Sequence, residues 1–503
     1  MRRFLGALAL CVTGGTVVAQ GPTPRVPVRL GQPGPLLASR IVAGVLATPH
    51  VVIAPADSPF VMRRAQAIDS SVIVLGRDAY VAGHVGGDLL VIGGDLYLRP
   101  GARVGGRAIA IGGGVYPSTL ALSGQQLSYR DFTYDAVPAA NGYVLDYRAL
   151  IATRSPPLTW PGVYGIRLPM YDRSDGLSLP VAPLFTAAGG SLRIEPRITY
   201  RSNLGRIDPS IDLDQDIGAS NSLHAFAGRS TYSNDAWIWS DLVNSVESFV
   251  FGHDTRNYYR ATRAEATFAH TAEGATMTLQ PYIGGRFERA SAVGPWPGST
   301  SSAWSFLGRH DVDDMLRPNV PIAQHNFVSL VGGAVLHGSS QGVQWNARLD
   351  LEGARPVGTV VAAARDFGQA TFDGRITLPT FASQSLRVDG HAVLSDGSTP
   401  FQRFAFIGGP GTIPTIKLLS EGGDQLVFVD SRYSIPVSLV TLPFAGSPTL
   451  VLRHVVGGAG VGRLPKLDQA VGARAYLSLF YVEAMVDPAT RHVHTGYGLS
   501  LGR

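Results

Sequence analysis

The sequence is poor in cysteine, in charge and in long apolar runs. Its one cysteine, Cys11, lies near the start, and charged residues make up 16% of the 503 residues, against about 25% in an average soluble domain. After residue 20 no uninterrupted apolar run reaches the length of about 18 residues that a spanning helix needs. These absences argue against a disulfide-stapled scaffold, a cysteine metal site and a helical membrane protein.

The start of the chain has the three parts of a secretory signal peptide. Arg2 and Arg3 form a basic region, residues 4–18 are largely apolar, and small residues precede a cleavage position near Ala19. The proline-rich stretch that follows has no stop-transfer pattern, so cleavage is favoured over a retained anchor. We therefore expect an exported chain, with a signal peptide that ends at residue 19 and a linker over residues 20–59.

The composition is compatible with an exported chain that is embedded in a membrane as a β-barrel. The chain has 60 glycines, 34 prolines and a formal net charge of +5. A closed β-barrel crosses a bilayer with alternating strands, which never form a continuous apolar run. No basic run is interleaved with aromatic residues, so nucleic acid is not an expected partner. The composition favours the bacterial outer membrane as the location and its lipid as a partner.

A short glycine-marked repeat follows the linker. The runs "VIVLG", "LLVIGG" and "AIAIGGG" superimpose, with Gly76, Gly93 and Gly112 at the same place in each copy. This pattern predicts a parallel β-solenoid of about two and a half coils, over residues 60–118, and a further linker over residues 119–159. An irregular glycine-rich sheet is the alternative. The segment resembles the bactofilin type of polymer-forming β-solenoid.

Alternation of polar and apolar side chains recurs from residue 160 onward. In "LRIEPRITYR" (192–201) and "RIDPSIDLDQ" (206–215) apolar residues take every second place. Short turns separate some of these segments and long polar stretches separate others, which is typical of an outer-membrane barrel. Allowing roughly 22 residues per strand and connection, residues 160–503 hold about 16 strands. The predicted fold class is all-β, a transmembrane antiparallel β-barrel after a short solenoid, with a secreted β-sandwich as the alternative.

Three stretches carry a resemblance to a known family. They are "YDRSDGLSLPVAPLF" (171–185), "FIGGPGTIPTIK" (406–417) and "GGDQLVFVDSRYSIPV" (422–437). They resemble parts of the BamA/TamA-type outer-membrane assembly-factor barrels, also called the bacterial surface antigen family. In that family a Gly-Gly strand end leads into a long loop that folds back into the lumen. The resemblance implies a lumenal loop here, with the candidate residues Gly408, Gly409, Gly411, Pro414 and Lys417.

The composition of this loop suits a place inside a barrel. Its glycines permit tight turns, and it has no charge before Lys417. The family's loop carries an Arg-Gly-aromatic tip, where this sequence has Pro414, Thr415 and Ile416. The family's partner aspartate is also missing, because "VLRHVVGGAGVG" offers glycines instead. Since a buried charge without its partner is costly, the joint loss predicts a loop held by packing.

These departures leave two classes of function open. One is assembly or translocation at the outer membrane, which needs periplasmic partners and a seam between the first and last strands. The other is a passive channel or a structural anchor to periplasmic or cell-wall components. The family's periplasmic docking repeats are not recognisable, so the sequence does not decide between the two. The last strand is expected to be recognised by the outer-membrane assembly machinery, and its outward face would carry Val493, Tyr497, Leu499 and Leu501.

Candidate catalytic groups have simpler explanations, so we do not expect an enzyme, a cofactor or a metal. Ser340 sits in "GSSQG", but this stretch joins two strand patterns where a nucleophile elbow needs a strand followed by a helix. His253 and Asp254 lack an identifiable third group. His492 and His494 share a face with glycines and have no carboxylate nearby in the sequence. A barrel lipase is a distant third possibility.

Overall fold

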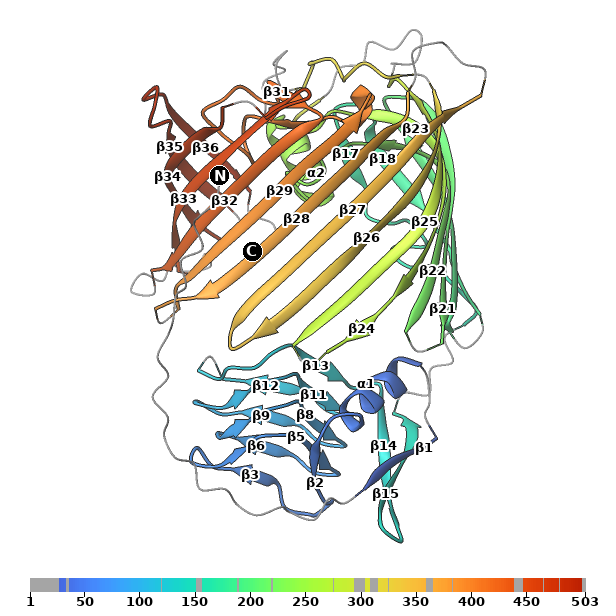
Figure 1. Ribbon diagram of the computed structural model, residues 1–503, viewed down its shortest axis with the longest axis vertical. Helices are drawn as coiled ribbons and strands as arrows, with labels where there is room; N and C mark the ends of the chain where they lie inside the picture. Colours follow the sequence, from blue (N-terminus) through green and yellow to red (C-terminus); the bar gives the residue numbers. More distant parts are fainter. Residues whose placement is uncertain are drawn as a thin grey trace, which may run out of the picture.

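Figure 1 shows the computed structural model, in which a small β-solenoid lies below a large curved sheet. The expected signal peptide, with Cys11 and Ala19, lies outside the described residues. The structure describes residues 27–32, 36–118, 120–150, 156–187, 190–218, 220–274, 276–293, 304–307, 315–323, 325–358, 365–381, 383–437, 447–464, 466–478 and 480–499.

Three parallel sheets form the solenoid. They run in the orders β13-β11-β8-β5-β2, β12-β9-β6-β3 and β10-β7-β4. With five strands in one sheet, the solenoid has more coils than the glycine repeat predicts, because the first and last coils lack the repeat. The strands are β2 (His50–Ile53), β3 (Phe60–Met62), β4 (Ala67–Ile68), β5 (Ser71–Leu75), β6 (Ala79–Val81), β7 (His84–Val85), β8 (Leu89–Ile92), β9 (Leu96–Leu98), β10 (Arg103–Val104), β11 (Ala108–Ile111), β12 (Val115–Pro117) and β13 (Gln126–Tyr129).

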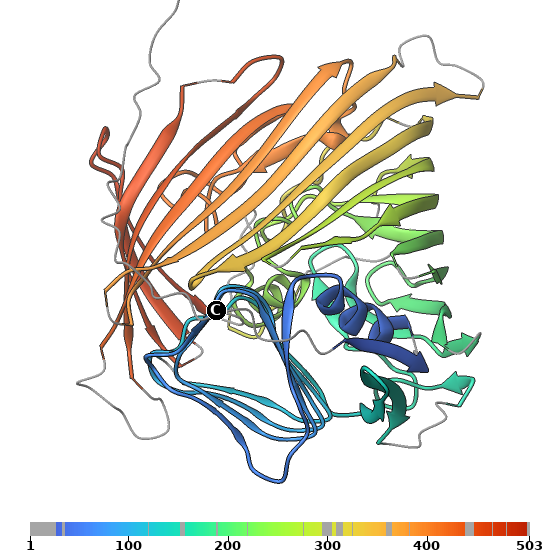
Figure 2. The same ribbon diagram turned by 60° about the horizontal axis from the view of Figure 1, so that its bottom comes forward.

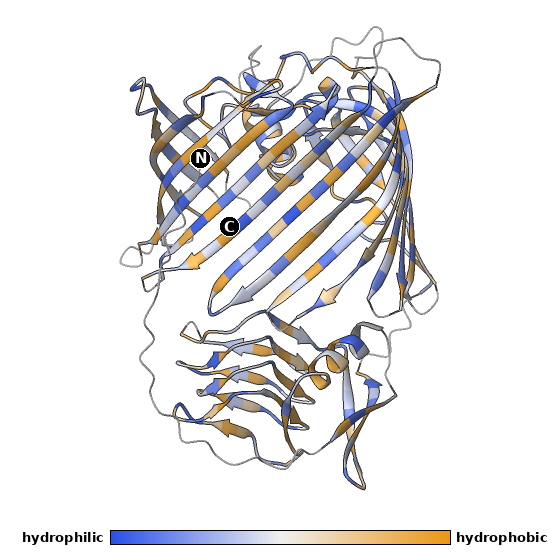
Figure 3. Ribbon diagram, viewed as in Figure 1, coloured by the Kyte–Doolittle hydropathy of each residue, from blue (hydrophilic) through white to orange (hydrophobic). Residues whose placement is uncertain are grey.

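The central strands of the solenoid are buried on both faces. On β5, Val72 and Val74 face the inside of the solenoid, while Ile73 and Leu75 pack on the outer side. β8 and β11 repeat this arrangement. Strands buried on both sides have nearly continuous apolar runs, which explains the repeated runs in the sequence. The same strands are mostly orange in the hydropathy view (Figure 3).

The outer side of these strands is covered by segments that sequence analysis assigns to linkers. Helix α1 (Leu36–Leu46) packs there through Ile41, Val42 and Val45, together with β14 (Phe132–Ala139) and β15 (Gly142–Ala149). β1 (Val28–Gln32) pairs in parallel with β15. The folded region therefore extends on both sides of residues 60–118. The prolines near these segments led to their assignment as linkers. Without them, the apolar outer side of the solenoid would be exposed to water, which folded proteins avoid.

Apart from a separate two-stranded sheet within residues 405–423, the strands from residue 158 onward form one antiparallel sheet that curves around on itself (Figure 2). β18 and β19 are successive parts of one strand beside β20, β23 and β24 are successive parts of one strand beside β25, and β16 and β17 share one position. The sheet therefore has about 16 spans, which confirms the predicted fold class. The strands are β16 (Leu158–Thr159), β17 (Met170–Asp172), β18 (Gly176–Val181), β19 (Leu184–Ala187), β20 (Leu192–Arg201), β21 (Arg206–Ile217), β22 (Asn221–Tyr232), β23 (Tyr259–His270), β24 (Ala272–Glu273), β25 (Met277–Ser291), β26 (Asn326–Ser340), β27 (Val343–Val357), β28 (Phe367–Pro379), β29 (Ser385–Gly397), β32 (Gln425–Pro436), β33 (Thr449–Gly460), β34 (Asp468–Leu477), β35 (Phe480–Val486) and β36 (Val493–Leu499).

The barrel strands separate apolar from polar side chains. On β25, Ile283 and Phe287 are exposed on the outer surface, whereas Tyr282 and Arg286 line a cavity inside the sheet. Figure 3 shows the resulting stripes of orange and blue along the long strands. A band of apolar residues outside and polar residues inside is the pattern of a barrel that crosses a bilayer.

The two ends of the sheet do not pair with each other. β17 begins the sheet and β36 ends it, and within the described residues no ladder joins them. Between β16 and β17 the chain leaves the strand path, because Val163 and Ile166 bond to each other in a tight turn. Helix α2 (Asp241–Phe251), in the connection between β22 and β23, contacts both β17 and β36. None of the described helices is long and apolar enough to cross a membrane.

Candidate functional site

The connection between β29 and β32, residues 398–424, lies inside the curve of the sheet and is termed the inner loop. It contains η2 (Phe401–Arg403), β30 (Ala405–Ile407) and β31 (Glu421–Gly423). Ile407 and Ile413 are fully buried and pack against Leu426 of β32 and Val455 of β33. The inner loop is therefore part of the barrel core on the side formed by the last strands.

The structure brings the predicted residues of this loop together in a compact turn. Gly408, Gly409 and Gly411 all have positive φ, at 118°, 80° and 91°. The Gly409 N–H donates to the carbonyl of Ile416 at 2.9 Å, and the Gly408 N–H donates to the hydroxyl of Thr412 at 2.9 Å. The positive φ values need glycine, because a Cβ is strained there. Pro414 is buried, and Lys417 is exposed.

An ion cluster in the barrel wall binds the tip of the inner loop. The Arg453 guanidinium, from β33, donates to the carbonyl of Thr412 at 3.3 Å and to Asp430 of β32 at 2.8 Å. It also lies 3.3 Å from Glu483 of β35. Its side chain is fully buried, so these acceptors supply the compensation that a buried charge needs. Two further arginines pair with the same carboxylates, namely Arg432 and Arg474.

The inner loop is therefore held by a charged hydrogen bond from Arg453 as well as by the packing that the sequence predicts. The arginine belongs to the wall, and the inner loop offers a backbone carbonyl in place of a side chain. Sequence reasoning missed Arg453 because it searched the strand for an aspartate. The sequence feature that could have predicted this ion pair is the presence of Asp430 and Arg453 at inward-facing positions of two neighbouring strands.

A second cluster fixes the start of the inner loop. Arg403, in η2, lies 2.9 Å from Glu288 of β25 and 3.0 Å from Glu352 of β27. It also donates to the hydroxyl of Tyr259 at 2.9 Å. Its side chain is 5% exposed. Sequence reasoning missed this residue, because its two carboxylate partners come from strands more than 50 residues away in the chain.

Asp235 joins the inner loop to the connection between β22 and β23. Its carboxylate accepts from the N–H of Asn257 at 2.9 Å and from the N–H of Phe406 at 3.2 Å. The side chain is buried, and this burial raises the pKa of Asp235 to about 7. The contact between the two connections therefore depends on a carboxyl group that titrates near neutrality.

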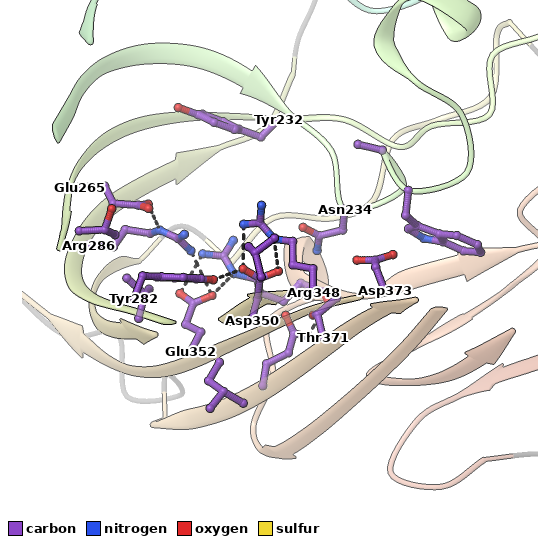
Figure 4. Close-up of a pocket in the computed structure, with 18 of the residues that line it drawn as sticks. Tyr232, Asn234, Glu265, Tyr282, Arg286, Arg348, Asp350, Glu352, Thr371 and Asp373 are labelled. Carbon is purple, nitrogen blue, oxygen red and sulfur yellow. Dashed lines mark hydrogen bonds and ion pairs between the residues drawn. The ribbon is translucent and has the colours of Figure 1, made fainter. Parts of the chain in front are cut away.

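A polar cavity of about 920 Å³ lies beside the Arg403 cluster. Figure 4 shows hydrogen bonds and ion pairs among several of its charged side chains. Arg286 donates to Glu265 at 2.5 Å and lies 3.4 Å from Glu352, while Tyr282 and Arg348 both bind Asp350. Because these charges are paired, the cavity presents mixed polarity and no concentration of one sign.

The other predicted residues fall at several places in the barrel. Val493 and Tyr497 are 60% exposed on β36, Leu499 ends that strand, and Leu501 lies outside the described residues. Ser340 is the last residue of β26, at the hairpin turn to β27.

The histidines named in the sequence lie around a further cavity, of about 430 Å³, together with Lys417 and Pro414. They are His253, His492 and His494. Within the described ranges no group of three or more histidine, cysteine or acidic residues is arranged to hold a metal ion.

The solenoid meets the lower end of the barrel near β24. Arg107 of the solenoid pairs with Asp88 at 2.8 Å and lies 3.5 Å from Glu273 of β24. A cavity of about 750 Å³ lies at this junction, lined by Leu122 and Gly124 on one side and Ser339 on the other. Figure 2 shows the solenoid in front of one part of the barrel's lower end.

Comparisons with known proteins find likeness only in structure. No family model matches the sequence, and no curated protein sequence matches it. The chain is similar to CdiB from Acinetobacter baumannii, with 11% identity over 73% of this chain and 64% of that chain and a TM-score of 0.41. For CdiB from Escherichia coli the values are 11%, 73%, 66% and 0.42. The chain thus spans less than two thirds of either CdiB chain.

A third similar structure is BamA from Haemophilus ducreyi lacking POTRA domains 1–3. Identity is 10%, the alignment covers 73% of this chain and 75% of that chain, and the TM-score is 0.45. This protein is of the type that the three sequence stretches resemble.

Proposed function

We propose that the chain is a bacterial outer-membrane β-barrel protein that assists the assembly or translocation of polypeptides. The observation that carries this proposal is that, among the described residues, no strand pairing joins β17 and β36, in a barrel whose interior is occupied by the inner loop. An exposed sheet edge can pair with an extended chain through main-chain hydrogen bonds. A simple pore is expected to have a closed sheet, because an unpaired edge can pair with other chains and promote aggregation.

Other features are consistent with this role. The apolar outer face of the strands suits outer-membrane lipid as the surrounding solvent. The last strand carries Val493, Tyr497 and Leu499, and the outer-membrane assembly machinery would recognise it during insertion. The solenoid, at the lower end of the barrel, offers a place for a periplasmic or cell-wall partner. The BamA/TamA-type resemblance implies the same class of activity.

The direct test is folding catalysis in a reconstituted membrane. The purified protein is inserted into liposomes, and the rate at which a small unfolded outer-membrane barrel folds into the same liposomes is measured. The proposal expects faster folding than in protein-free liposomes and in liposomes with heat-inactivated protein. Equal rates in all three would contradict an assembly role for the chain alone.

The second candidate is a passive channel or a structural anchor. The polar cavity of about 920 Å³ favours the channel, because a water-filled, charged interior is typical of pores. Planar-bilayer conductance separates the candidates. Steady conductance steps would support the channel, and their absence, in protein known to be folded, would leave the assembly or anchoring role.

A further inference from the structure

The seam of the barrel presents an energetic problem. A backbone N–H or C=O left without a partner in a bilayer is costly, and among β-structures only closed barrels avoid such groups. Within the part of the chain that the structure describes, β17 and β36 are both edge strands. Something other than strand pairing must cover them if the chain is to be stable in lipid.

Helix α2 supplies hydrogen-bond acceptors to both edges. Ser245 Oγ accepts from the N–H of Tyr171 in β17 at 2.7 Å, and the Glu247 carboxylate accepts from the N–H of Leu499 in β36 at 2.5 Å. Residues two apart on a helix of 3.6 residues per turn point about 200° away from each other. The two acceptors are therefore directed to opposite sides, as a bridge between two strands requires.

Aromatic contacts repeat the same bridge. Phe249 packs edge-on against Tyr171, with ring centroids 5.5 Å apart, and Phe251 packs edge-on against Tyr497, at 5.6 Å. Space at the β36 side is tight, because a Cβ at Gly498 would lie 2.7 Å from the Glu247 carboxylate. The last strand therefore approaches the helix closely only because it has glycine at this position.

The burial of α2 is the reverse of that of a helix on a water-soluble core. Its buried residues are polar, namely Asn244, Ser245, Glu247 and Ser248, while Leu242 and Phe249 are 40% and 43% exposed. Residues 304–307 extend this surface, since the Phe306 N–H donates to the Phe249 carbonyl at 2.8 Å and Phe306 is 68% exposed. Exposed apolar side chains of this kind match the outward-facing residues of the strands, such as Leu330 at 65%.

We propose that α2 is a clasp that replaces strand pairing at the seam. Ser245 holds the first strand, Glu247 holds the last, and the apolar side of the helix faces the acyl chains of the lipid. Displacement of the helix would expose both sheet edges at once. The clasp follows from the edge contacts and does not depend on the assembly role, because a channel or an anchor would need the same cover.

Hydrogen exchange of the liposome-inserted protein, read by mass spectrometry, tests the clasp. Glu247→Leu should speed exchange in the peptide that contains Leu499 by about tenfold or more, since a hydrogen bond to a charged group is lost. Exchange in β27 should not change. Glu247→Gln keeps an acceptor and should restore most of the protection. Asp241→Asn, on the exposed first turn of the same helix, is the matched control and should leave β36 as in the wild type.

Ser245→Ala examines the other edge with a change of one atom, so folding should be preserved. It should speed exchange in the peptide that contains Tyr171 and leave β36 protected. Unchanged exchange at both edges in Ser245→Ala and Glu247→Leu would overturn the clasp. Equally faster exchange in all strands would also overturn the clasp, because it would mean that Ser245 and Glu247 stabilise the whole fold and not the two edges in particular. If Glu247→Leu does not fold, Ser245→Ala decides: faster exchange confined to the peptide that contains Tyr171 supports the clasp, and unchanged exchange in that peptide overturns it.

Discussion

Buried arginines fix the inner loop to the barrel wall at two places. Arg403 reaches from the loop to Glu288 and Glu352, while Arg453 reaches from the wall to the Thr412 carbonyl. In each case the guanidinium is almost fully buried and has several acceptors. A buried ion cluster as a whole adds little net stability. Removal of one charged member destabilises the fold, however, because the remaining members stay buried and charged.

Replacement of Arg403 should therefore have a large effect. Arg403→Met leaves Glu288 and Glu352 without their shared cation, and we expect the free energy of unfolding to fall by about 3 to 5 kcal/mol. Urea unfolding of the detergent-folded protein measures it. The control is Arg355→Met, which breaks an exposed pair with Asp366, with side chains 76% and 62% exposed, and should cost less than about 1 kcal/mol. Similar losses for the two variants would contradict the proposed anchoring.

Asp235 should make stability depend on pH. Burial raises its pKa to about 7 in the folded protein, against about 3.9 in an unfolded chain. The folded state then binds the proton more tightly, so the contribution of Asp235 to stability is fully present below about pH 4 and is lost as pH rises to about 7. Asp235→Asn should flatten this part of the profile. A difference in stability between wild type and variant that stays constant from about pH 4 to about pH 7 would contradict the assignment.

At the scale of elements, alternation in the sequence predicts the strands well. The two quoted segments correspond to β20 and β21, where one face meets the outside and the other the interior. Helix α2 could not be predicted in the same way, because its polar residues are buried and its apolar residues are exposed. Its position also depends on contacts with strands that lie far away in the chain, such as β36.

The inner loop should close only if its glycines are kept. Gly408→Ala places a methyl 2.2 Å from the Lys417 carbonyl at a φ of 118°, so the turn cannot form as it stands. Gly462→Ala is the control, since Gly462 also has a positive φ, of 69°, but nothing lies within 4 Å of the added methyl. That control should cost about 1 to 2 kcal/mol from backbone strain alone.

A lysine-specific protease measures loop closure, because Lys417 and Lys466 are the only lysines in the sequence. We expect Gly408→Ala to be cleaved at Lys417 at least several times faster than the wild type. Cleavage at Lys466, in the turn before β34, should be equal in all variants and serves as the internal standard. If Gly408→Ala resists cleavage at Lys417 as well as Gly462→Ala does, the loop does not depend on this turn.

At the scale of the whole molecule, the chain combines a parallel solenoid with an antiparallel barrel. Both parts follow from hydrophobic pattern: continuous runs for strands buried on both faces, and alternation for strands with one face toward the interior. The pattern did not predict the cover of α1, β14 and β15 over the solenoid, nor the ion clusters inside the barrel. Both features depend on contacts between segments that are far apart in the sequence, and the pattern within one segment does not identify the segment that it contacts.

The most direct test of the account is the electrophoretic mobility of the detergent-folded protein with and without boiling. A folded outer-membrane barrel resists detergent in the gel until it is boiled, so we predict two distinct bands for the wild type. The shift should persist in Asp241→Asn and become labile in Arg403→Met. A single band under both conditions, from protein that stays in solution without detergent, would contradict the membrane barrel and favour a secreted β-sandwich.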